Sequence, residues 1–320
     1  MLARRGLLAA ALAAPSFARA QAPWPSRPVK IVVPFPPGGS NDTIARPLAE
    51  VLTRKLGHSF IIENRGGAGG SIGAAAVAQA AADGHTLMVH SSSFPTSAVL
   101  QKTPWDAEAS FDAITTLARA PFFILVHPSF PARTIAELVA EAKRRPGAID
   151  YASSGTGGIN HFTTEHFCLQ AGIRMNMVPY RGTAAAVTDL MAGHVQVMNT
   201  SVASANAAIR EGRVRVIAAT DEGAELPPGV PPVTSVKAQG IDYDMRIWWG
   251  LFAPKGLPAP LRQRILAAAT EALKDPNLAR IYDAEGAKPA PAADGEFAEV
   301  LHADLARWRQ VKEAANIRAE

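Results

Sequence analysis

The sequence predicts an α/β protein with two lobes, each a mostly parallel sheet flanked by helices. Three observations lead to this fold class. β-branched runs alternate with glycine-containing loops and helical segments, which is typical of a mostly parallel sheet covered by helices. This strand–loop–helix pattern occurs in two sets, joined by extended segments near residues 118–128 and 241–253. The 320 residues, 48% of them hydrophobic, are sufficient for two domains of ordinary size.

The first set opens with a strand, a glycine loop and a helix start. Residues 30–33 predict a buried strand, and the Pro-Pro-Gly-Gly loop at 36–39 ends it. A helix follows from about Thr43 to Leu56, and residues 40–42 (Ser-Asn-Asp) can cap its start. Such a loop points unpaired N–H groups and the positive end of a helix dipole at one place, where a carboxylate or phosphate is favoured. An ordinary βα turn has the same pattern, so this loop alone leaves both interpretations open.

The rest of the first set repeats this order. We expect a strand at 59–64, an Ala-rich helix at 72–82 and a strand at 86–90. The loop at 67–73 is close to the dinucleotide-binding fingerprint, but its third glycine falls one position late and no suitable acidic residue follows. We therefore expect these glycines to let the helix pack tightly on the sheet, and we expect no nicotinamide cofactor.

The second set begins with a strand at 149–153 and repeats the design of the first unit. Its loop at 154–161 combines glycines with hydroxyl residues and leads into a helix at 162–170. Thr134 and Glu137 have the spacing of a capping box that opens a helix to about Arg145. Further strands are expected at 122–126, 175–179, 195–199, 214–219 and 245–253, further helices at 183–192, 203–210, 260–274 and 297–315, and a Pro-rich surface loop at 226–232.

Two lobes that face each other would hold a ligand between paired loops. The reason is that ligand sites in such sheets lie outside the carboxyl ends of the strands. We expect residues 21–125 with 248–320 to form one lobe and residues 126–247 to form the other. Trp248 and Trp249 lie in the second linking segment, and because side chains alternate along a strand, only one of them can face the cleft. We expect the other to be in the core.

Residues 1–20 have the pattern of a signal peptide. Arg4 and Arg5 form a basic start, residues 6–14 form an apolar run too short to span a bilayer, and Ala18-Arg19-Ala20 fits the small-x-small cleavage rule. We expect cleavage after Ala20 and export of the mature chain. The arginine pair loosely resembles a twin-arginine signal but lacks the preceding polar residue, so we favour the general secretory route and leave the other open.

Charge and cysteine content exclude several classes of protein. Residues 1–20 contain three arginines and no acidic residue, so the mature chain has 29 basic and 28 acidic residues and a net charge of about +1. No dense run of Lys and Arg remains, and we expect no nucleic-acid partner. The single cysteine, Cys168, excludes an intramolecular disulfide and is expected to be a small buried residue of a helix.

Six stretches together carry a family resemblance. They read PFPPGGSND at 34–42, ENRGGAGG at 63–70, DGHTL at 83–87, YASSGTGGINH at 151–161, VPYRG at 178–182 and FAPKG at 252–256. In this order and at this spacing, from about Pro25 to the C-terminus, they resemble the periplasmic substrate-binding proteins of tripartite tricarboxylate transporters, often called the Bug family. Three positions depart from the family pattern: Gly158 replaces a common serine, Gln196 replaces a usual aspartate, and residues 231–236 differ.

The resemblance implies a Venus-flytrap fold in the periplasm that closes on a small carboxylate and docks on membrane permease subunits. The two glycine loops would grasp one carboxyl group through backbone amides, hydroxyls and waters. We expect a monomer without a cofactor or a metal ion. The residues that we expect to bind the ligand are Pro37, Gly38, Gly39, Ser40, Asn41, Asp42, Ser92, Thr156, Gly157, Gly158, His161, Tyr180, Arg181, Thr200 and Ser201.

Four of these residues have two interpretations each. Asp42 can cap the first helix or meet the ammonium group of an amino-acid ligand. His161 can donate to an anion or be satisfied by its neighbours. Arg181 can bind a distal carboxylate with two donors or form a surface ion pair. Tyr180 suits a pocket wall or a buried structural position. Dicarboxylates, aromatic carboxylates, amino acids and nicotinate-like molecules all fit a carboxylate cradle.

Two other functions remain as alternatives. A sensory binding protein would use the same closed form to report to a membrane sensor kinase. A secreted serine hydrolase would need a catalytic triad, but no Gly-x-Ser-x-Gly elbow is present and the histidines lack the spacing of a zinc protease. We therefore expect no enzyme activity. The triad candidates are Ser92, Ser153 and Ser201 with His90, His161 and Asp42.

Overall fold

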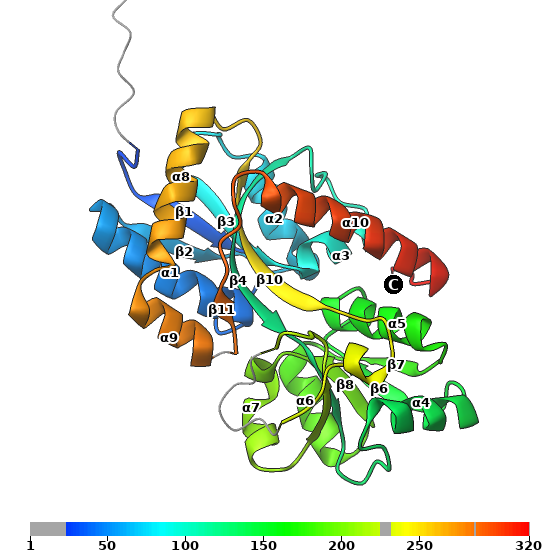
Figure 1. The fold of residues 1–320 in the computed structure, drawn as a ribbon. Coiled ribbons are helices and arrows are strands. Elements are labelled where there is room, and N and C mark those ends of the chain that lie inside the picture. Colours follow the sequence, from blue (N-terminus) through cyan, green and yellow to red (C-terminus); the bar gives the residue numbers. More distant parts are fainter. Residues whose placement is uncertain (1–23, 225–231, 285, 320) are drawn as a thin grey trace, which may run out of the picture.

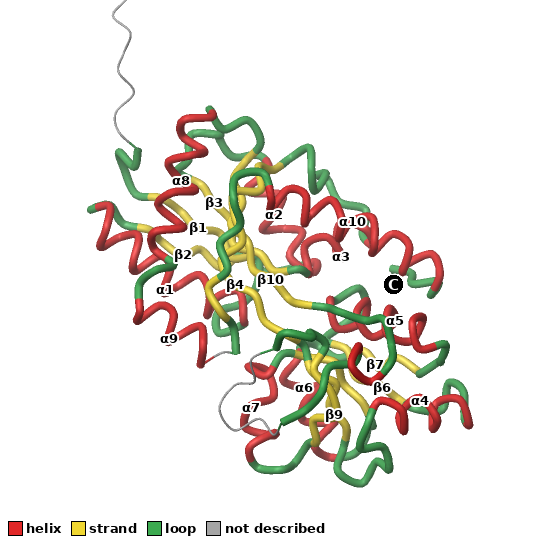
Figure 2. Tube along the Cα trace, in the orientation of Figure 1, coloured by secondary structure: helices red, strands yellow, loops and turns green. Residues whose placement is uncertain are grey.

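The computed structural model describes residues 24–224, 232–284 and 286–319, which form two lobes (Figure 1). Each lobe has a sheet at its centre and helices on both sides of it (Figure 2). The predicted signal peptide and all but the last residue of the predicted Pro-rich loop lie outside the described residues. Within the described ranges no helix combines the length and the apolar character that a membrane span requires.

The first lobe contains a six-stranded sheet in the order β11-β4-β10-β3-β1-β2. Helices α1, α8 and α9 lie on one side of this sheet and α2, α3 and α10 on the other (Figure 2). The strands are β1 (Val29–Val33), β2 (Phe60–Asn64), β3 (Thr86–Ser91), β4 (Phe111–Pro121), β10 (Arg246–Pro254) and β11 (Lys288–Pro289). The helices are α1 (Ser40–Leu56), α2 (Ser71–Ala78), α3 (Ser93–Leu100), α8 (Ala259–Ala272), α9 (Pro276–Ala284) and α10 (Glu296–Ala314), with a short 3-10 turn η1 (Ala68–Gly70).

The second lobe contains a five-stranded sheet in the order β7-β6-β8-β5-β9. Its strands are β5 (Phe123–Val126), β6 (Asp150–Ser153), β7 (Asn176–Pro179), β8 (Val197–Thr200) and β9 (Arg215–Ala219). Its helices are α4 (Ile135–Arg144), α5 (Ile159–Ala171), α6 (Thr183–Ala192) and α7 (Val202–Arg210), with the 3-10 turn η2 (Lys237–Gln239) on the return path. Cys168 is buried in α5, as predicted.

Both sheets are mixed: most strands of each sheet run in one direction, as predicted, and one linking strand in each runs the other way. β1 pairs in parallel with β2 and β3, and β6 pairs in parallel with β7 and β8. In contrast, β10 is antiparallel to β3 and β4, and β5 is antiparallel to β8 and β9. The linking strands cause this difference, because a strand that arrives from the other lobe enters the sheet from the opposite end.

Most predicted strands and helices are present, with ends shifted by a few residues. α1 begins at Ser40 rather than Thr43, and α5 begins at Ile159 rather than Phe162. The sequence pattern did not predict α3, α9, β11 or the part of β4 that precedes residue 118. In α3, Pro95 and several Ser and Thr residues have low helix propensity, although proline is tolerated in the first turn where its missing N–H has no helical partner.

The glycine loop before α2 provides close packing, as predicted. A Cβ at Gly73 would lie 2.6 Å from the Cβ of Pro34 and 2.8 Å from the carbonyl oxygen of Arg65. Real Cβ atoms do not approach other atoms so closely, so a side chain here would push α2 away from the end of β1.

The two segments that link the lobes meet at Thr220, which is fully buried. Its hydroxyl accepts the N–H of Phe122 at 2.9 Å and lies 2.6 Å from the carbonyl oxygen of Met245, to which it can donate. Its backbone N–H and C=O pair with the same two residues at 2.8 and 2.9 Å. Thr220 therefore joins the two linking segments to each other by hydrogen bonds.

Trp248 and Trp249 are both buried in the core of the first lobe, so the expectation that one of them faces the cleft is wrong. The Trp248 indole N–H donates to the carboxylate of Asp304 on α10 at 2.8 Å. β10 is an inner strand with helices on both faces of its sheet, and its alternating side chains therefore point into two covered layers.

The last helix, α10, also connects the two lobes. Its buried Trp308 packs edge-on against Phe162 of α5, with ring centroids 5.8 Å apart. His166 of the same helix meets the Trp308 ring at 6.2 Å. Helix α5 therefore rests on the first lobe through aromatic contacts.

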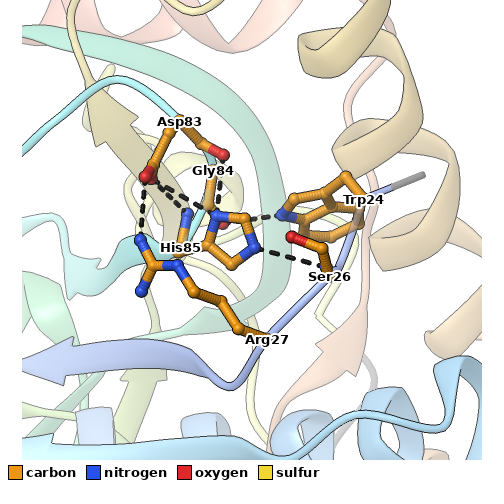
Figure 3. A network of polar contacts seen from close by, with 6 residues as sticks. All are labelled: Trp24, Ser26, Arg27, Asp83, Gly84 and His85. Carbon is orange, nitrogen blue, oxygen red and sulfur yellow. Dashed lines mark hydrogen bonds and ion pairs between the residues drawn. The ribbon is translucent and has the colours of Figure 1, made fainter. Parts of the chain in front are cut away.

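The segment before β1 is fastened to the turn before β3 by polar contacts (Figure 3). The Trp24 indole donates to the carbonyl of Gly84 at 2.9 Å, and Arg27 pairs with Asp83 at 2.8 Å. His85 accepts the N–H of Ser26 at 3.4 Å, and its other ring nitrogen lies 3.0 Å from the Asp83 carbonyl (Figure 3). This part of the DGHTL stretch thus has a structural role.

Candidate ligand-binding site

A cavity of about 730 Å³ lies between the lobes and contains both glycine loops. Residues from the two sheets and from helix starts on both sides form its wall. They are Phe35, Pro36, Pro37, Gly38, Gly39, Ser40, Asn41, Gly69, Ser91, Ser93, Ser97 and Gln101 with Ile247 from the first lobe and its linking strand, and Phe122, Ser154, Gly155, Thr156, Gly157, Gly158, Ile159, Asn160, Arg181, Gly182, Thr183, Ala184, Thr200, Ser201 and Ser204 from the second lobe and its linking segment.

Five helices of the described chain begin at this cavity. They are α1 and α3 of the first lobe and α5, α6 and α7 of the second, and for each of them the cap or a residue of the first turn lines the wall. The first N–H groups of a helix have no partner within it and carry a partial positive charge. Five such ends around one space make it favourable for an anion.

The charged side chains reinforce this preference. Among the described residues of the cavity wall, Arg181 is the only charged one, and no carboxylate is present. The Arg181 guanidinium forms no ion pair with any other described residue and is free to meet a ligand. A buried anion there would gain charge-assisted hydrogen bonds without meeting a like charge.

The structure brings eleven of the fifteen predicted ligand-binding residues to the cavity wall. Those that it places there are Pro37, Gly38, Gly39, Ser40, Asn41, Thr156, Gly157, Gly158, Arg181, Thr200 and Ser201. It does not place Asp42, Ser92, His161 and Tyr180 there, and each of these four has a structural reason to lie behind the wall.

Asp42 holds the first glycine loop instead of facing the cavity. Its carboxylate accepts the N–H of Gly38 at 2.9 Å, the Arg46 guanidinium at 2.8 Å and the Asn64 amide at 2.9 Å. Burial tends to raise the pKa of Asp42, but these hydrogen bonds hold it below the usual value, so the group is ionised. It is not the helix cap either, because Gly39 occupies that position.

His161 supports the second glycine loop from below. Its Nδ1 accepts the N–H of Gly157 at 3.2 Å, and burial lowers its pKa to about 4, so the ring is neutral near pH 7. Asn160 acts similarly: its side-chain oxygen lies 2.8 Å from the Ser154 hydroxyl, and its NH₂ donates to the Asn199 carbonyl at 2.6 Å. The loop geometry therefore depends on two side chains of the first turn of α5.

Tyr180 and Ser92 are set back from the cavity for different reasons. The Tyr180 hydroxyl donates to Asp189 at 2.8 Å, and burial together with this carboxylate raises its pKa to about 12. Ser92 lies between Ser91 and Ser93, which line the cavity, but its own side chain is buried and its hydroxyl has no partner among the described residues.

The sequence reasoning missed the polar face of α3, formed by Ser93, Ser97 and Gln101. Ser93 and Ser97 are four positions apart, so they share one side of α3, and Gln101 follows directly after the last helical residue. The spacing is visible in the sequence, but it has meaning only once a helix is recognised there, and Pro95 argues against one.

The candidate triad residues are not assembled. Among the described residues, neither His90 nor His161 hydrogen-bonds a serine hydroxyl or Asp42: Nδ1 of His90 lies 3.2 Å from the carbonyl of Ser91, and His161 serves Gly157. Burial lowers the pKa of His90 to about 3. The searched part of the chain also brings together no group of three His, Cys, Asp or Glu side chains that could hold a metal ion.

Comparisons with known proteins agree with this geometry. Residues 44–317 match the family described as "Tripartite tricarboxylate transporter family receptor". Among solved structures, the chain is similar to the protein Rpa4515 of R. palustris, solved with adipate, at 29% sequence identity and a TM-score of 0.81, covering 92% of this chain and 99% of that one.

Two further solved structures are similar over nearly their whole length. The periplasmic binding protein BugD has 30% identity and a TM-score of 0.78, with 93% of this chain and 100% of that chain covered. MatC (Rpa3494) from Rhodopseudomonas palustris, solved with bound malate, has 29% identity and a TM-score of 0.76, with 90% of this chain and 99% of that chain covered.

Proposed function

This chain belongs to the tripartite tricarboxylate transporter receptor family, whose members are periplasmic solute-binding proteins, and we propose that it captures a small organic carboxylate between its lobes. In this proposal the loops at 37–41 and 155–158 hold one carboxyl group, and Arg181 meets the rest of the ligand. The closed complex then delivers the carboxylate to membrane permease subunits.

One observation carries the proposal. Five helices begin at a cavity whose described wall holds one arginine and no carboxylate. Backbone N–H groups can bind an anion strongly without a formal positive charge, since hydrogen bonds to an ionised group are stronger than neutral ones. The same arrangement disfavours a cationic ligand, because Asp42 is engaged by Arg46 and Asn64. Adipate and malate in the similar proteins are both carboxylates, which supports the assignment.

Several features of the proposal go beyond the described site. We propose that residues 1–20 are a signal peptide cleaved after Ala20, and that the lobes comprise residues 21–125 with 248–320 and residues 126–247. We also propose that the protein is a monomer and has no catalytic activity. The hydrogen bonds of His90 and His161, which involve the Ser91 carbonyl and the Gly157 N–H rather than a serine hydroxyl or Asp42, support the last point.

A ligand screen by thermal shift tests the proposal, because a ligand that binds only the folded state raises the melting temperature. The panel pairs each small carboxylate with its uncharged amide. We expect a rise with carboxylates and none with the amides. A rise with the amides as well, or with cationic compounds alone, would contradict the proposal. Denaturing the protein and analysing the released molecules by mass spectrometry identifies a ligand retained from the expression host.

A variant pair tests the glycine cradle itself. Gly39 has an extended backbone (φ −79°), and a Cβ there would approach only the Pro36 carbonyl oxygen, at 3.7 Å. Gly39→Val therefore fits the fold but fills the place where a ligand would approach the backbone, and we expect binding to be lost. Gly223→Val is the matched control, since a Cβ at this exposed glycine would lie 3.8 Å from Asp221 and away from the cavity. Equal affinity in both variants would refute the cradle.

A further inference from the structure

The part of the cavity beyond the glycine loops is lined by hydroxyl and amide side chains from both lobes. Ser93, Ser97 and Gln101 form one side, and opposite residues come from the starts of α6 and α7 and the end of β8. The members of this second group are Thr183, Thr200, Ser201 and Ser204. Hydroxyl groups can both donate and accept hydrogen bonds, whereas a carboxylate or an aliphatic chain has no donor to offer.

Several of these polar groups have no partner within the protein. Thr200 is only 2% exposed, and its hydroxyl makes no hydrogen bond with any other described residue. The side chains of Gln101 and Thr183 are likewise unpaired in the described chain. Asn41, 5% exposed, keeps a buried amide oxygen without a partner. Leaving such groups unpaired when a ligand displaces water would weaken binding.

An acceptor such as the Asn41 oxygen needs a donor from the ligand, and two kinds are common in small acids: ammonium and hydroxyl. The cavity wall offers no described carboxylate to neutralise an ammonium group, and Arg181 and the helix starts would repel it. A hydroxyl carries no charge and suits both the Asn41 acceptor and the hydroxyl side chains around it.

The described wall exposes few large apolar side chains that could pack against an unsubstituted chain or a ring. Phe122, Ile159 and Ile247 line the cavity but are each less than a tenth exposed, so they form its floor. Phe35 is the one aromatic side chain of the described wall that is more exposed, and its ring is partly covered edge-on by His90 at 5.2 Å.

From these observations we infer that the ligand is a hydroxylated organic acid without a cationic group, whose hydroxyls pair with Thr200, Asn41 and the polar face of α3. This inference rests on the proposed function and narrows its ligand class. It predicts that hydroxylation, rather than chain length or aromaticity, decides selectivity.

Calorimetry with two matched ligand series tests the inference. Succinate, malate and aspartate share a four-carbon chain and carry no substituent, a hydroxyl or an ammonium group, while adipate and galactarate are the plain and hydroxylated six-carbon acids. We expect the hydroxylated member of at least one series to bind roughly tenfold tighter than its plain analogue, as one well-made hydrogen bond to an otherwise unpaired group allows. Aspartate should bind more weakly than malate.

Variants of Thr200 connect this selectivity to the structure. Thr200→Val keeps the shape of the side chain and should lower the hydroxylated-to-plain affinity ratio roughly fivefold. Thr200→Ser keeps the hydroxyl and should preserve the ratio even if both acids bind somewhat more weakly. The control is Thr188→Val on the exposed side of α6, which should leave both affinities unchanged.

The outcomes separate the inference from the proposed function. If plain acids bind as tightly as hydroxylated ones, or if Thr200→Val lowers both affinities equally, the inference fails while carboxylate binding stands. If aspartate binds tightest, the ligand carries an ammonium group and the inference is overturned. If no acid of either series binds but another carboxylate of the thermal-shift panel does, the inference fails alone; if no carboxylate binds, the proposed function fails together with it.

Discussion

Gly157→Ala should weaken ligand binding because it blocks the contact between the second glycine loop and α3. A Cβ at position 157 would lie 2.1 Å from Cδ2 and 3.4 Å from Cγ of Leu100. Leu100 is 8% exposed, so it has little room to move aside. These two residues belong to different lobes, and the steric conflict therefore arises only when the lobes approach.

The magnitude follows from two separate terms. Overpacking in a well-packed region destabilises by about 1–3 kcal/mol. If the open form escapes this penalty, the affinity should fall roughly 5- to 150-fold, at about 1.4 kcal/mol for each factor of ten. The backbone of Gly157 has φ +80°, where alanine is disfavoured by about 1–2 kcal/mol, but this second penalty acts in both forms and should lower only the melting temperature.

Calorimetry on a carboxylate that passes the thermal-shift screen measures the effect. Gly147→Ala is the matched control, since Gly147 has φ +77° and no atom within 4 Å of its Cβ position. It should lose stability without losing affinity. In the double variant Leu100→Ala/Gly157→Ala the conflict is removed, and part of the affinity should return. The reasoning is refuted if Gly147→Ala and Gly157→Ala lower the affinity equally, or if Leu100→Ala restores none of it.

Three further variants test other parts of the structure. Arg181→Gln should lower the carboxylate affinity at least roughly tenfold and make the affinity less dependent on salt, because a charged donor is lost. Calorimetry at two ionic strengths measures both effects, and an unchanged salt dependence would contradict the prediction. Thr220→Val should lower the free energy of unfolding by about 1–3 kcal/mol, since it leaves the buried N–H of Phe122 without its hydroxyl partner. Denaturant titration measures this loss, and the same titration of Thr188→Val, at an exposed threonine, is the control and should show a much smaller change. Burial lowers the pKa of His166 from 6.5 to about 4, so between these pH values the unfolded chain binds more protons than the folded one, and the melting temperature should fall as the pH decreases from 6.5 to 4. His166→Gln should make this fall smaller. An unchanged pH profile of the melting temperature in the variant would exclude His166 as a cause.

The fold was largely predictable because its signals are local. The β-branched run at 29–33 and the capping residues Thr134 and Glu137 specify a strand and a helix without help from distant residues: the Glu137 N–H donates to the Thr134 hydroxyl at 3.2 Å, as the capping pattern predicts. The direction of the linking strands was not predictable in this way. Whether β10 runs parallel or antiparallel to its neighbours depends on the return path from the other lobe, which no local pattern encodes.

The candidate site was predictable where backbone forms it and less so where side chains do. The glycine loops at 36–39 and 155–158 lie at the cavity because each joins a strand end to a helix start. The sequence alone could not show that the Asp42 and His161 side chains accept hydrogen bonds from the loop N–H groups of Gly38 and Gly157 and do not line the cavity. In each pair the two residues are about one helical turn apart, so a side chain near a helix start can contact either the ligand or the loop. The polar face of α3 was not predicted because Pro95 argues against a helix at this place, and the spacing of the polar residues indicates a shared face only within a helix.

The strand order of the first sheet has a consequence for how the chain folds. β10 lies between β3 and β4, although it follows them by the length of the whole second lobe. Until residues 246–254 are available, the facing edges of β3 and β4 have no partner and expose unpaired N–H and C=O groups. During synthesis from the N-terminus, the first lobe therefore stays an incomplete, aggregation-prone intermediate until the second lobe and β10 have been made. The final pairing of β10 is also expected to be slow, because it joins residues that are distant in sequence. The second sheet uses only residues 123–219 and has no such delay, so the middle of this chain should be the first part to become native.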